Sequence, residues 1–202
     1  MIGIINYGLG NIGSIVNMLD YLYLDSRVID GPGESVDIDR YILPGVGSFD
    51  RGMQGLSTSR LDEFLKSEVI LRGKPLLGIC LGMQLLTEGS EEGTLPGLGW
   101  VPASTVRLQP RGTEKIPHMG WRAVSVIREN RIMSTDDHSR FYFVHGYGVM
   151  CKNEEDVVAT VDYAQGFCAC FEHKNIFGVQ FHPEKSHRFG LSLLRRYGTM
   201  VI

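Results

Sequence analysis

Cysteine is scarce in this sequence, and its spacing matches no disulfide or metal framework. Four cysteines occur in 202 residues, at positions 80, 151, 168 and 170, and no two of them form a CxxC pair. Small secreted proteins that depend on disulfides contain far more cysteine, and many zinc and redox motifs use the CxxC spacing. We therefore expect four reduced thiols.

Long apolar runs and an excess of one charge are also missing. The longest apolar stretch, residues 75–86, contains two glycines and is too short to cross a bilayer. The first residues include no basic region of a secretory signal. Twenty basic residues against 23 acidic ones give a net charge of -3, which does not favour nucleic acid or an anionic membrane as a partner. We expect a cytoplasmic protein with no nucleic-acid or membrane partner, built as one domain over residues 1–202.

The first half of the chain alternates short apolar runs with helical patterns. Strands are predicted at residues 2–6, 27–29, 41–43 and 75–79, and helices at residues 12–24, 56–71 and 81–88. Buried strands that alternate with helices are typical of a parallel sheet with helices on both faces. The pattern predicts an α/β fold with a doubly wound, mostly parallel, flavodoxin-like sheet and flanking helices.

The second half is rich in β-pattern and closes with one helix. The predicted strands are at residues 101–108, 123–127, 141–147, 157–161, 167–172 and 176–181, and the helix is at residues 187–197. Lys174 and Asn175 join two of these runs as a hairpin turn, and residues 89–99 are a glycine- and proline-rich loop. We expect antiparallel strands in this half.

The strongest local motif is the segment 78–82, which reads Gly-Ile-Cys-Leu-Gly. It follows an apolar strand and precedes a helix, which is the setting of a nucleophile elbow with cysteine in the place of serine. A helix N-terminus favours the thiolate of Cys80, and the N–H of Leu81 points toward an oxyanion formed on the attacked carbonyl. A buried structural cysteine at a strand end is the competing interpretation.

A base and a group that orients it follow another predicted strand. His182 and Glu184 flank Pro183 directly after the strand at residues 176–181, where open α/β sheets hold their sites. Glu184 is close enough to hold one ring nitrogen of His182 while the other faces Cys80. A solvent-exposed His-Pro turn is the alternative. The glycines on both sides of Val46, again after a strand, let a peptide N–H approach the same carbonyl.

Together these motifs give the chain a resemblance to the class I (triad-type) glutamine amidotransferases. The matching segments are residues 7–11, 43–47, 78–86, 117–121, 142–145 and 178–186, so the resemblance covers essentially the whole chain. The elbow and the His-Pro-Glu segment are typical of the whole family. Residues 117–121 and 142–145 narrow the resemblance to the glutaminase subunits of imidazole glycerol phosphate synthase, from histidine biosynthesis.

The resemblance implies a role for each motif residue. Cys80, His182 and Glu184 would form the catalytic triad. Donors to the oxyanion would come from Leu81 and from the region of Val46 and Gly47. The remaining residues fall into a glutamine pocket and a partner interface, namely Gln84, Glu92, Gly146 and Tyr147 for the pocket and Gly10, Asn11 and Lys185 for the interface. A free amino acid carries one positive and one negative group, so a pocket with an acid and exposed N–H groups suits it.

The function implied is hydrolysis of L-glutamine to glutamate and ammonia through a cysteine thioester. The ammonia would pass to a (β/α)8-barrel cyclase, in a heterodimer that makes imidazole glycerol phosphate and AICAR, with no cofactor in the glutaminase. Two residues depart from the family pattern, because Arg122 stands where asparagine is usual and Gly146 where serine or threonine is usual. They leave open a related glutaminase that supplies ammonia for amidation of a nucleotide sugar in surface polysaccharide (O-antigen) synthesis.

Three other interpretations compete with the glutaminase. Residues 8–13 form a literal GxGxxG between a strand and a helix, and Asp30 ends the next strand, so dinucleotide binding is a distant alternative. Cys168 and Cys170 share a strand face near several histidines, but none has zinc-ligand spacing, and we expect no metal site. A protein that only regulates its partner is disfavoured because all three triad residue types are present.

Overall fold

The computed structural model describes residues 1–33, 37–135 and 139–201. Five parallel strands form one half of its main sheet, and the sheet order brings together β2 (Ser26–Ile29), β1 (Ile2–Ile5), β3 (Arg40–Leu43), β4 (Leu76–Ile79) and β12 (Ile176–Val179). Every residue of β1, β3, β4 and β12 is buried. Such strands need cover on both faces, which explains their continuous apolar sequence.

The other half of the sheet is antiparallel and comes mainly from the second half of the chain. It contains β11 (Phe167–His173), β10 (Val157–Val161), β7 (Ser125–Val126), β9 (Tyr147–Cys151) and β5 (Ala103–Arg107). A separate ribbon pairs β6 (His118–Ala123) with β8 (Arg140–His145). The α/β class, the parallel sheet and the antiparallel strands of the second half are as the sequence predicts.

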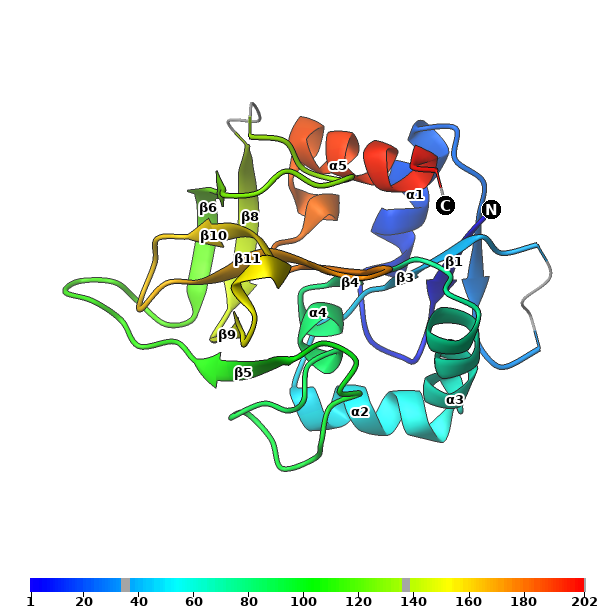
Figure 1. Cartoon of the computed structure of the whole chain (residues 1–202), viewed down its shortest axis with the longest axis horizontal. Coiled ribbons are helices and arrows are strands. Elements are labelled where there is room, and N and C mark those ends of the chain that lie inside the picture. Colours follow the sequence, from blue (N-terminus) through cyan, green and yellow to red (C-terminus); the bar gives the residue numbers. More distant parts are fainter. Residues whose placement is uncertain (34–36, 136–138, 202) are drawn as a thin grey trace.

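Helices cover the two faces of the parallel sheet (Figure 1). On one face lie α1 (Ile12–Tyr21) and α5 (His187–Thr199), whose apolar side chains share one buried cluster. On the other face lie α2 (Phe49–Thr58), α3 (Leu61–Leu65) and α4 (Leu81–Leu85), which share a second cluster. Three short helical turns complete the described elements, namely η1 (Lys66–Leu71), η2 (Glu154–Asp156) and η3 (Pro183–Lys185). The sheet therefore separates two cores, as a doubly wound fold requires.

The predicted helix over residues 56–71 is wrong as a single element. Arg60, in the left-handed conformation at φ 57°, separates α2 from α3, and α3 runs on into the π-helical turn η1. The sequence hides the start of α2 because its glycines look like loop signals. In the structure they allow close packing, since a Cβ on Gly52 would lie 2.9 Å from Leu85 and one on Gly55 would lie 2.7 Å from the Tyr7 carbonyl oxygen.

Several other boundaries differ from the prediction. Helix α4 ends at Leu85 rather than at residue 88, and the predicted strand at residues 123–127 is the end of β6 followed by the short strand β7. Strand β9 was not predicted, because Gly146 interrupts the apolar pattern and the chain pairs again only after it. The hairpin at Lys174 and the loop over residues 89–99 are confirmed.

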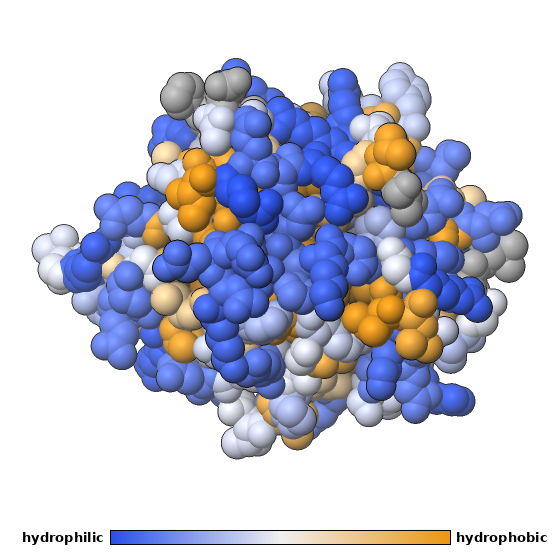
Figure 2. Space-filling model, viewed as in Figure 1, coloured by the Kyte–Doolittle hydropathy of each residue, from blue (hydrophilic) through white to orange (hydrophobic). Residues whose placement is uncertain are grey.

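The surface carries no large apolar area on the side shown in Figure 2. The described residues there are mostly hydrophilic, and apolar atoms occur in small, separate areas. A broad apolar interface is therefore not located on this face. Of the helices within the described ranges, none combines the length and the apolar character needed to span a bilayer.

Candidate active site

The predicted catalytic segments meet at the carboxyl ends of three neighbouring strands. Strand β3 leads to Pro44, β4 leads to Cys80, and β12 leads to His182, and these strands are adjacent in the sheet. The segments surround a cavity of about 200 Å³, which is lined by Val46, Gly47, Cys80, Leu81, Gln84, Glu92, Val144, His145, Gly146, Tyr147 and His182. All the residues predicted for the oxyanion hole and the glutamine pocket line this cavity, together with two members of the triad.

Cys80 has the strained backbone of a nucleophile elbow. Its φ of +53° and ψ of -110° are rare for a residue with a side chain, and such strain is maintained only where the surroundings enforce it. The close packing of the elbow against β3 enforces it here, and Gly82 allows that packing, because a Cβ on Gly82 would lie 1.8 Å from the Leu43 carbonyl oxygen. The turn aims Cys80 into the cavity and places the Leu81 N–H at the start of α4.

His182 and Glu184 form a buried pair beside Cys80. Nδ1 of His182 lies 2.7 Å from Oε1 of Glu184, and their side chains are only 1% and 2% exposed. Burial alone would lower the pKa of His182, but the charge of Cys80 and the bond to Glu184 outweigh it and raise that pKa to about 10. Burial opposes ionisation of Glu184 too, but the hydrogen bond and charge of His182 lower its pKa. The pair therefore favours an imidazolium at His182 held by the carboxylate of Glu184.

The second ring nitrogen of His182 is on the side of Cys80. Within the described part of the chain Nε2 is buried and has no hydrogen-bond partner, so it is available for the sulfur or for a leaving group. The backbone of His182 is fixed from both sides, because its N–H donates to the Tyr142 carbonyl at 2.9 Å and its carbonyl accepts from Ser186 Oγ at 2.6 Å. Proton transfer at Nε2 can occur without movement of the main chain.

Asn11 contacts the triad directly, which the sequence does not reveal. Its Nδ2 donates to Oε1 of Glu184 at 2.9 Å, so this oxygen accepts from both Asn11 and His182. The sequence predicted Asn11 as a partner-interface residue only. Because 173 positions separate Asn11 from Glu184, no local pattern could have linked them. The loop before α1 is thereby connected to the orienting carboxylate of the triad.

Replacing Asn11 by alanine should lower the turnover number for glutamine hydrolysis by about tenfold, because Glu184 loses one of the donors that orient it. The matched control is Asn175→Ala. The side-chain amide of Asn175 is a hydrogen-bond donor too, to the carbonyls of Val69 and Lys74. It lies just before β12, at the end of this strand opposite to the triad. Steady-state glutamate release checks both variants, and equal losses in the two would show that Asn11 has no specific effect on the triad.

The segment that carries Val46 is held against the elbow. Tyr7, whose pKa burial raises, keeps its proton and donates it to the Pro44 carbonyl at 2.8 Å. A Cβ on Gly45 would lie 2.6 Å from the Tyr7 oxygen and 2.7 Å from the Gly82 nitrogen, so only glycine fits there. Gly47 has a φ of +114°, which a side chain would strain. This packing brings the peptides at Val46 and Gly47 to the cavity wall near Leu81.

The predicted glutamine pocket contains one acidic side chain and two hydrogen-bonded amide side chains. Oε2 of Glu92 accepts from the N–H of Phe49 at 2.8 Å, which fixes the carboxylate at the start of α2 and at the cavity wall. Gln84 Nε2 donates to the Tyr147 carbonyl and to Gln180 Oε1, both at 3.0 Å. Gln180, which is fully buried, was not predicted as a site residue, although it lies in one of the motifs of the resemblance.

The glycine-rich loop over residues 8–13 packs on the same site. A Cβ on Gly10 would lie 3.1 Å from Pro44, and Asn11 is bound to Glu184. Asp30, the acid of the dinucleotide alternative, accepts a hydrogen bond from Asn6 Nδ2 at 2.6 Å. The loop that would have to cradle a pyrophosphate is thus engaged with the triad and the Val46 segment, which favours the glutaminase.

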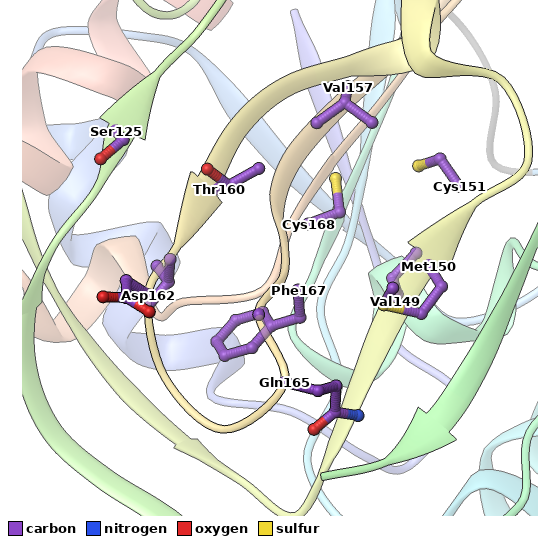
Figure 3. Close-up of a pocket in the computed structure, with 12 residues that line it drawn as sticks. Ser125, Val149, Met150, Cys151, Val157, Thr160, Asp162, Gln165, Phe167 and Cys168 are labelled. Carbon is purple, nitrogen blue, oxygen red and sulfur yellow. The ribbon is translucent and has the colours of Figure 1, made fainter. Parts of the chain in front are cut away.

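A larger cavity, of about 380 Å³, lies between β9, β10 and β11 and is separate from the triad (Figure 3). Cys151 and Cys168 line it, and burial raises the pKa of Cys168 well above its usual value. His173 is paired with Asp156 at 2.9 Å. Over the described residues, no cluster of histidine, cysteine or acidic side chains could hold a metal ion. A buried neutral thiol such as Cys168 is a poor nucleophile, and no member of the predicted triad lines this cavity.

The predicted interface residue Lys185 stands beside exposed aromatic and apolar side chains. Its ammonium lies 5.8 Å from the ring centre of Tyr142, and the Trp121 ring stacks on His187 at 5.6 Å. Met119 and Trp121 are 64% and 37% exposed. Arg122, one of the departures from the family pattern, lies over the Tyr163 ring at 5.0 Å. Strand β6 therefore presents large side chains to solvent near the triad.

Comparison with known proteins shows the family to which the chain is related. The family model described as "Glutamine amidotransferase class-I" matches residues 4–196. The chain is 44% identical over 202 residues to "Imidazole glycerol phosphate synthase subunit HisH 2" of Pseudomonas aeruginosa, covering 100% of each. It is 46% identical over 198 residues to a protein of the same name from Methanococcus maripaludis, covering 98% of each.

Solved structures agree with the fold. A crystal structure of a glutamine amidotransferase from Thermotoga maritima superposes with a TM-score of 0.62 over 97% of this chain and 79% of that chain, at 20% identity. Another glutamine amidotransferase crystal structure superposes with a TM-score of 0.73 over 98% of this chain and 96% of that chain, at 17% identity. At these identities the likeness concerns the fold alone. The family model and the relatives thus show the family, and the solved structures show the fold.

Proposed function

This chain belongs to the class I glutamine amidotransferase family, and we propose that Cys80, His182 and Glu184 are the triad of its glutaminase reaction. The observation that carries the proposal is the cavity at the ends of β3, β4 and β12, where Cys80 faces a buried His182–Glu184 pair. L-glutamine is the substrate, and glutamate and ammonia are the products. Residues 1–202 act as one glutamine amidotransferase domain.

The geometry supports a covalent mechanism. The thiolate of Cys80 attacks the side-chain amide carbon of glutamine, and the negative charge moves to the amide oxygen, where it meets the N–H groups of Leu81 and of the Val46–Gly47 region. The imidazolium of His182 gives its proton to the departing ammonia. Neutral His182 then takes a proton from the water that attacks the thioester, and the C–S bond breaks, which releases glutamate and restores the thiolate of Cys80 and the imidazolium of His182.

The pocket selects glutamine by binding the two charged groups of the free amino acid. Glu92 receives the ammonium group of glutamine, because its carboxylate is fixed at the cavity wall by the N–H of Phe49. The backbone at Gly146 and Tyr147 receives the carboxylate, and Gln84 lies beside it. This arrangement places the side-chain amide of glutamine over Cys80.

An electrophilic analogue of glutamine tests the assignment. It should add its mass to the peptide that contains Cys80 and leave Cys151, Cys168 and Cys170 unmodified, because only Cys80 lines the cavity with the triad. Peptide mass spectrometry after incubation of the intact protein gives the measurement, with excess glutamine as protecting competitor. Modification of another cysteine, or the absence of protection, would exclude Cys80 as the nucleophile.

Ammonia from this reaction goes to a second subunit. The relatives in Pseudomonas aeruginosa and Methanococcus maripaludis are named subunits of imidazole glycerol phosphate synthase, and they align over the full chain. We propose the same role here, in a cytoplasmic heterodimer with a (β/α)8-barrel cyclase that makes imidazole glycerol phosphate and AICAR for L-histidine. The docking face includes Gly10, Asn11 and Lys185, next to the exposed Met119 and Trp121.

The names of the relatives and two residues of this chain support a second candidate function, the supply of ammonia to a synthase that amidates a nucleotide sugar. Both relatives are called "HisH 2", and the resemblance drawn from the sequence expects asparagine at the position of Arg122 and serine or threonine at that of Gly146. Arg122 lies on β6 but on the face opposite Met119 and Trp121, where its exposed guanidinium packs over the Tyr163 ring, so it changes the surface of that second face. A related synthase that amidates a nucleotide sugar for surface polysaccharide would use the same glutaminase chemistry.

A further inference from the structure

A chain of hydrogen bonds connects the glutamine pocket to the nucleophile through two buried amide side chains. The Tyr147 carbonyl accepts from Gln84 Nε2 at 3.0 Å, and the same nitrogen donates to Gln180 Oε1 at 3.0 Å. Gln180 Nε2 in turn donates to Cys80 Sγ at 3.8 Å. Gln180 is fully buried between these partners, so no water replaces either contact.

The Tyr147 carbonyl fixes the donor and acceptor directions along this chain of hydrogen bonds, which we call the relay. A backbone carbonyl can only accept, so the side of Gln84 that faces Tyr147 must be its NH2 group. That nitrogen offers its second hydrogen to Gln180, and the facing atom of Gln180 must therefore be its oxygen. The NH2 group of Gln180 is then left facing the sulfur. Turning either amide around would place two acceptors or two donors against each other in a buried site.

We propose that Gln180 is a further catalytic residue, which donates an N–H to the Cys80 thiolate and owes its orientation to Gln84 and the Tyr147 carbonyl. A donor to a charged acceptor stabilises the charge more strongly than a neutral pair would. Gln180 therefore favours the thiolate over the thiol and fixes the position of the sulfur. The five-residue helix α4 is too short to do this through its dipole alone.

The relay also connects the substrate pocket to the nucleophile. Gln84 and Tyr147 line the cavity that takes glutamine, so bound substrate contacts the residues that orient Gln180. This inference rests on the proposed role of Cys80 as the nucleophile. The proposed function and the role of Gln180 can be tested separately. Glutamine hydrolysis by Cys80→Ala would contradict the proposed function. The experiment below measures only the ionisation of Cys80 and uses no glutamine, so it tests the role of Gln180 alone.

The test is the pH dependence of Cys80 alkylation by iodoacetamide, read by peptide mass spectrometry on the intact chain. In Gln180→Glu a carboxylate replaces the donor at the same size, so the midpoint of alkylation should rise by roughly one pH unit or more. Gln180→Met, which removes the donor without adding charge, should give a smaller rise. Gln84→Met should also give a smaller rise, because Gln180 loses the group that orients it.

The matched control is Gln165→Glu. Gln165 also uses its amide in two hydrogen bonds, with the Gln109 N–H and the Arg107 carbonyl, and both lie away from the triad. Its midpoint should equal that of the wild type. A wild-type midpoint in Gln180→Met would overturn the proposal, because a rise confined to Gln180→Glu is explained by the added charge alone.

A measurement on the unmodified protein covers the case in which these buried substitutions prevent folding. The side-chain amide resonances of Gln180 in ¹⁵N spectra should shift with pH at the midpoint of Cys80 alkylation, and those of Gln165 should not. Gln180 resonances that stay constant through this midpoint would contradict the proposed donor, whatever the variants do.

Discussion

Replacing Cys80 by alanine is expected to reduce glutamine hydrolysis by on the order of 10⁴-fold or more while the fold stays intact. The alternative nucleophile is water, and without the thioester His182 and the oxyanion donors support only a small residual rate. The side chain is small and almost fully buried at the end of β4, so its loss removes one sulfur atom and leaves the backbone of the elbow in place. Glutamate release from the complex with the synthase partner measures the effect.

The same variant separates chemistry from assembly. When ammonium salts replace glutamine, the complex that contains Cys80→Ala should form product at the wild-type rate, because only the supply of ammonia is lost. Cys151→Ala is the matched control, since this thiol lies in the separate cavity between β9 and β11. Substantial glutamine turnover by Cys80→Ala would refute a covalent mechanism through this residue.

The parts of the site that the sequence predicts are those encoded within a few neighbouring residues. The elbow needs an apolar strand, a cysteine between glycines and a helix, and all of these fall within residues 75–85. His182 and Glu184 are two residues apart and follow a strand, so their pairing is also local. The parallel half of the fold is predictable for the same reason, because strands buried on both faces have continuous apolar sequence.

The parts that sequence reasoning missed depend on packing between distant segments. Asn11 reaches Glu184 across 173 positions, and Gln180 reaches Cys80 across 100. Neither contact leaves a periodic or local signal. The start of helix α2 was also missed, because Gly52 and Gly55 look like loop residues until α4 and Tyr7 are placed against them. Glycine that serves close packing cannot be distinguished from glycine that serves a turn without the third dimension.

The position of the Val46 segment suggests how hydrolysis is controlled. Pro44, at its start, is held by Tyr7 and packs against Gly10, which belongs to the loop that we propose faces the partner. Gly47 lets the adjoining peptide rotate at little steric cost. The loss of one oxyanion donor costs about 10²–10³-fold in rate, so the orientation of a single peptide is sufficient to switch the enzyme. Such control prevents ammonia from being released into water, where it is protonated and no longer nucleophilic.

We therefore expect the isolated chain to hydrolyse glutamine slowly, and the cyclase with its ribonucleotide substrate to raise the rate by about 10²–10³-fold. Glutamate release should be compared for the chain alone, with the histidine-pathway cyclase, and with cyclase plus substrate. Lys185→Ala should reduce the stimulation because this side chain lies over the half-buried Tyr142 ring, which in turn contacts the exposed Trp121. Lys174→Ala, at the opposite ends of the strands, is the matched control.

The outcomes of this comparison decide between the two proposed partners. High activity of the chain alone would contradict control through the Val46 peptide. No response to the histidine-pathway cyclase, together with activation by a homologue from a sugar-amidation pathway, would assign the ammonia to a nucleotide sugar. Arg122 would then be the residue to exchange: Arg122→Asn should restore stimulation by the histidine-pathway cyclase if the guanidinium on β6 selects the partner. A variant that still responds only to the sugar-pathway homologue would place partner choice elsewhere on the docking face.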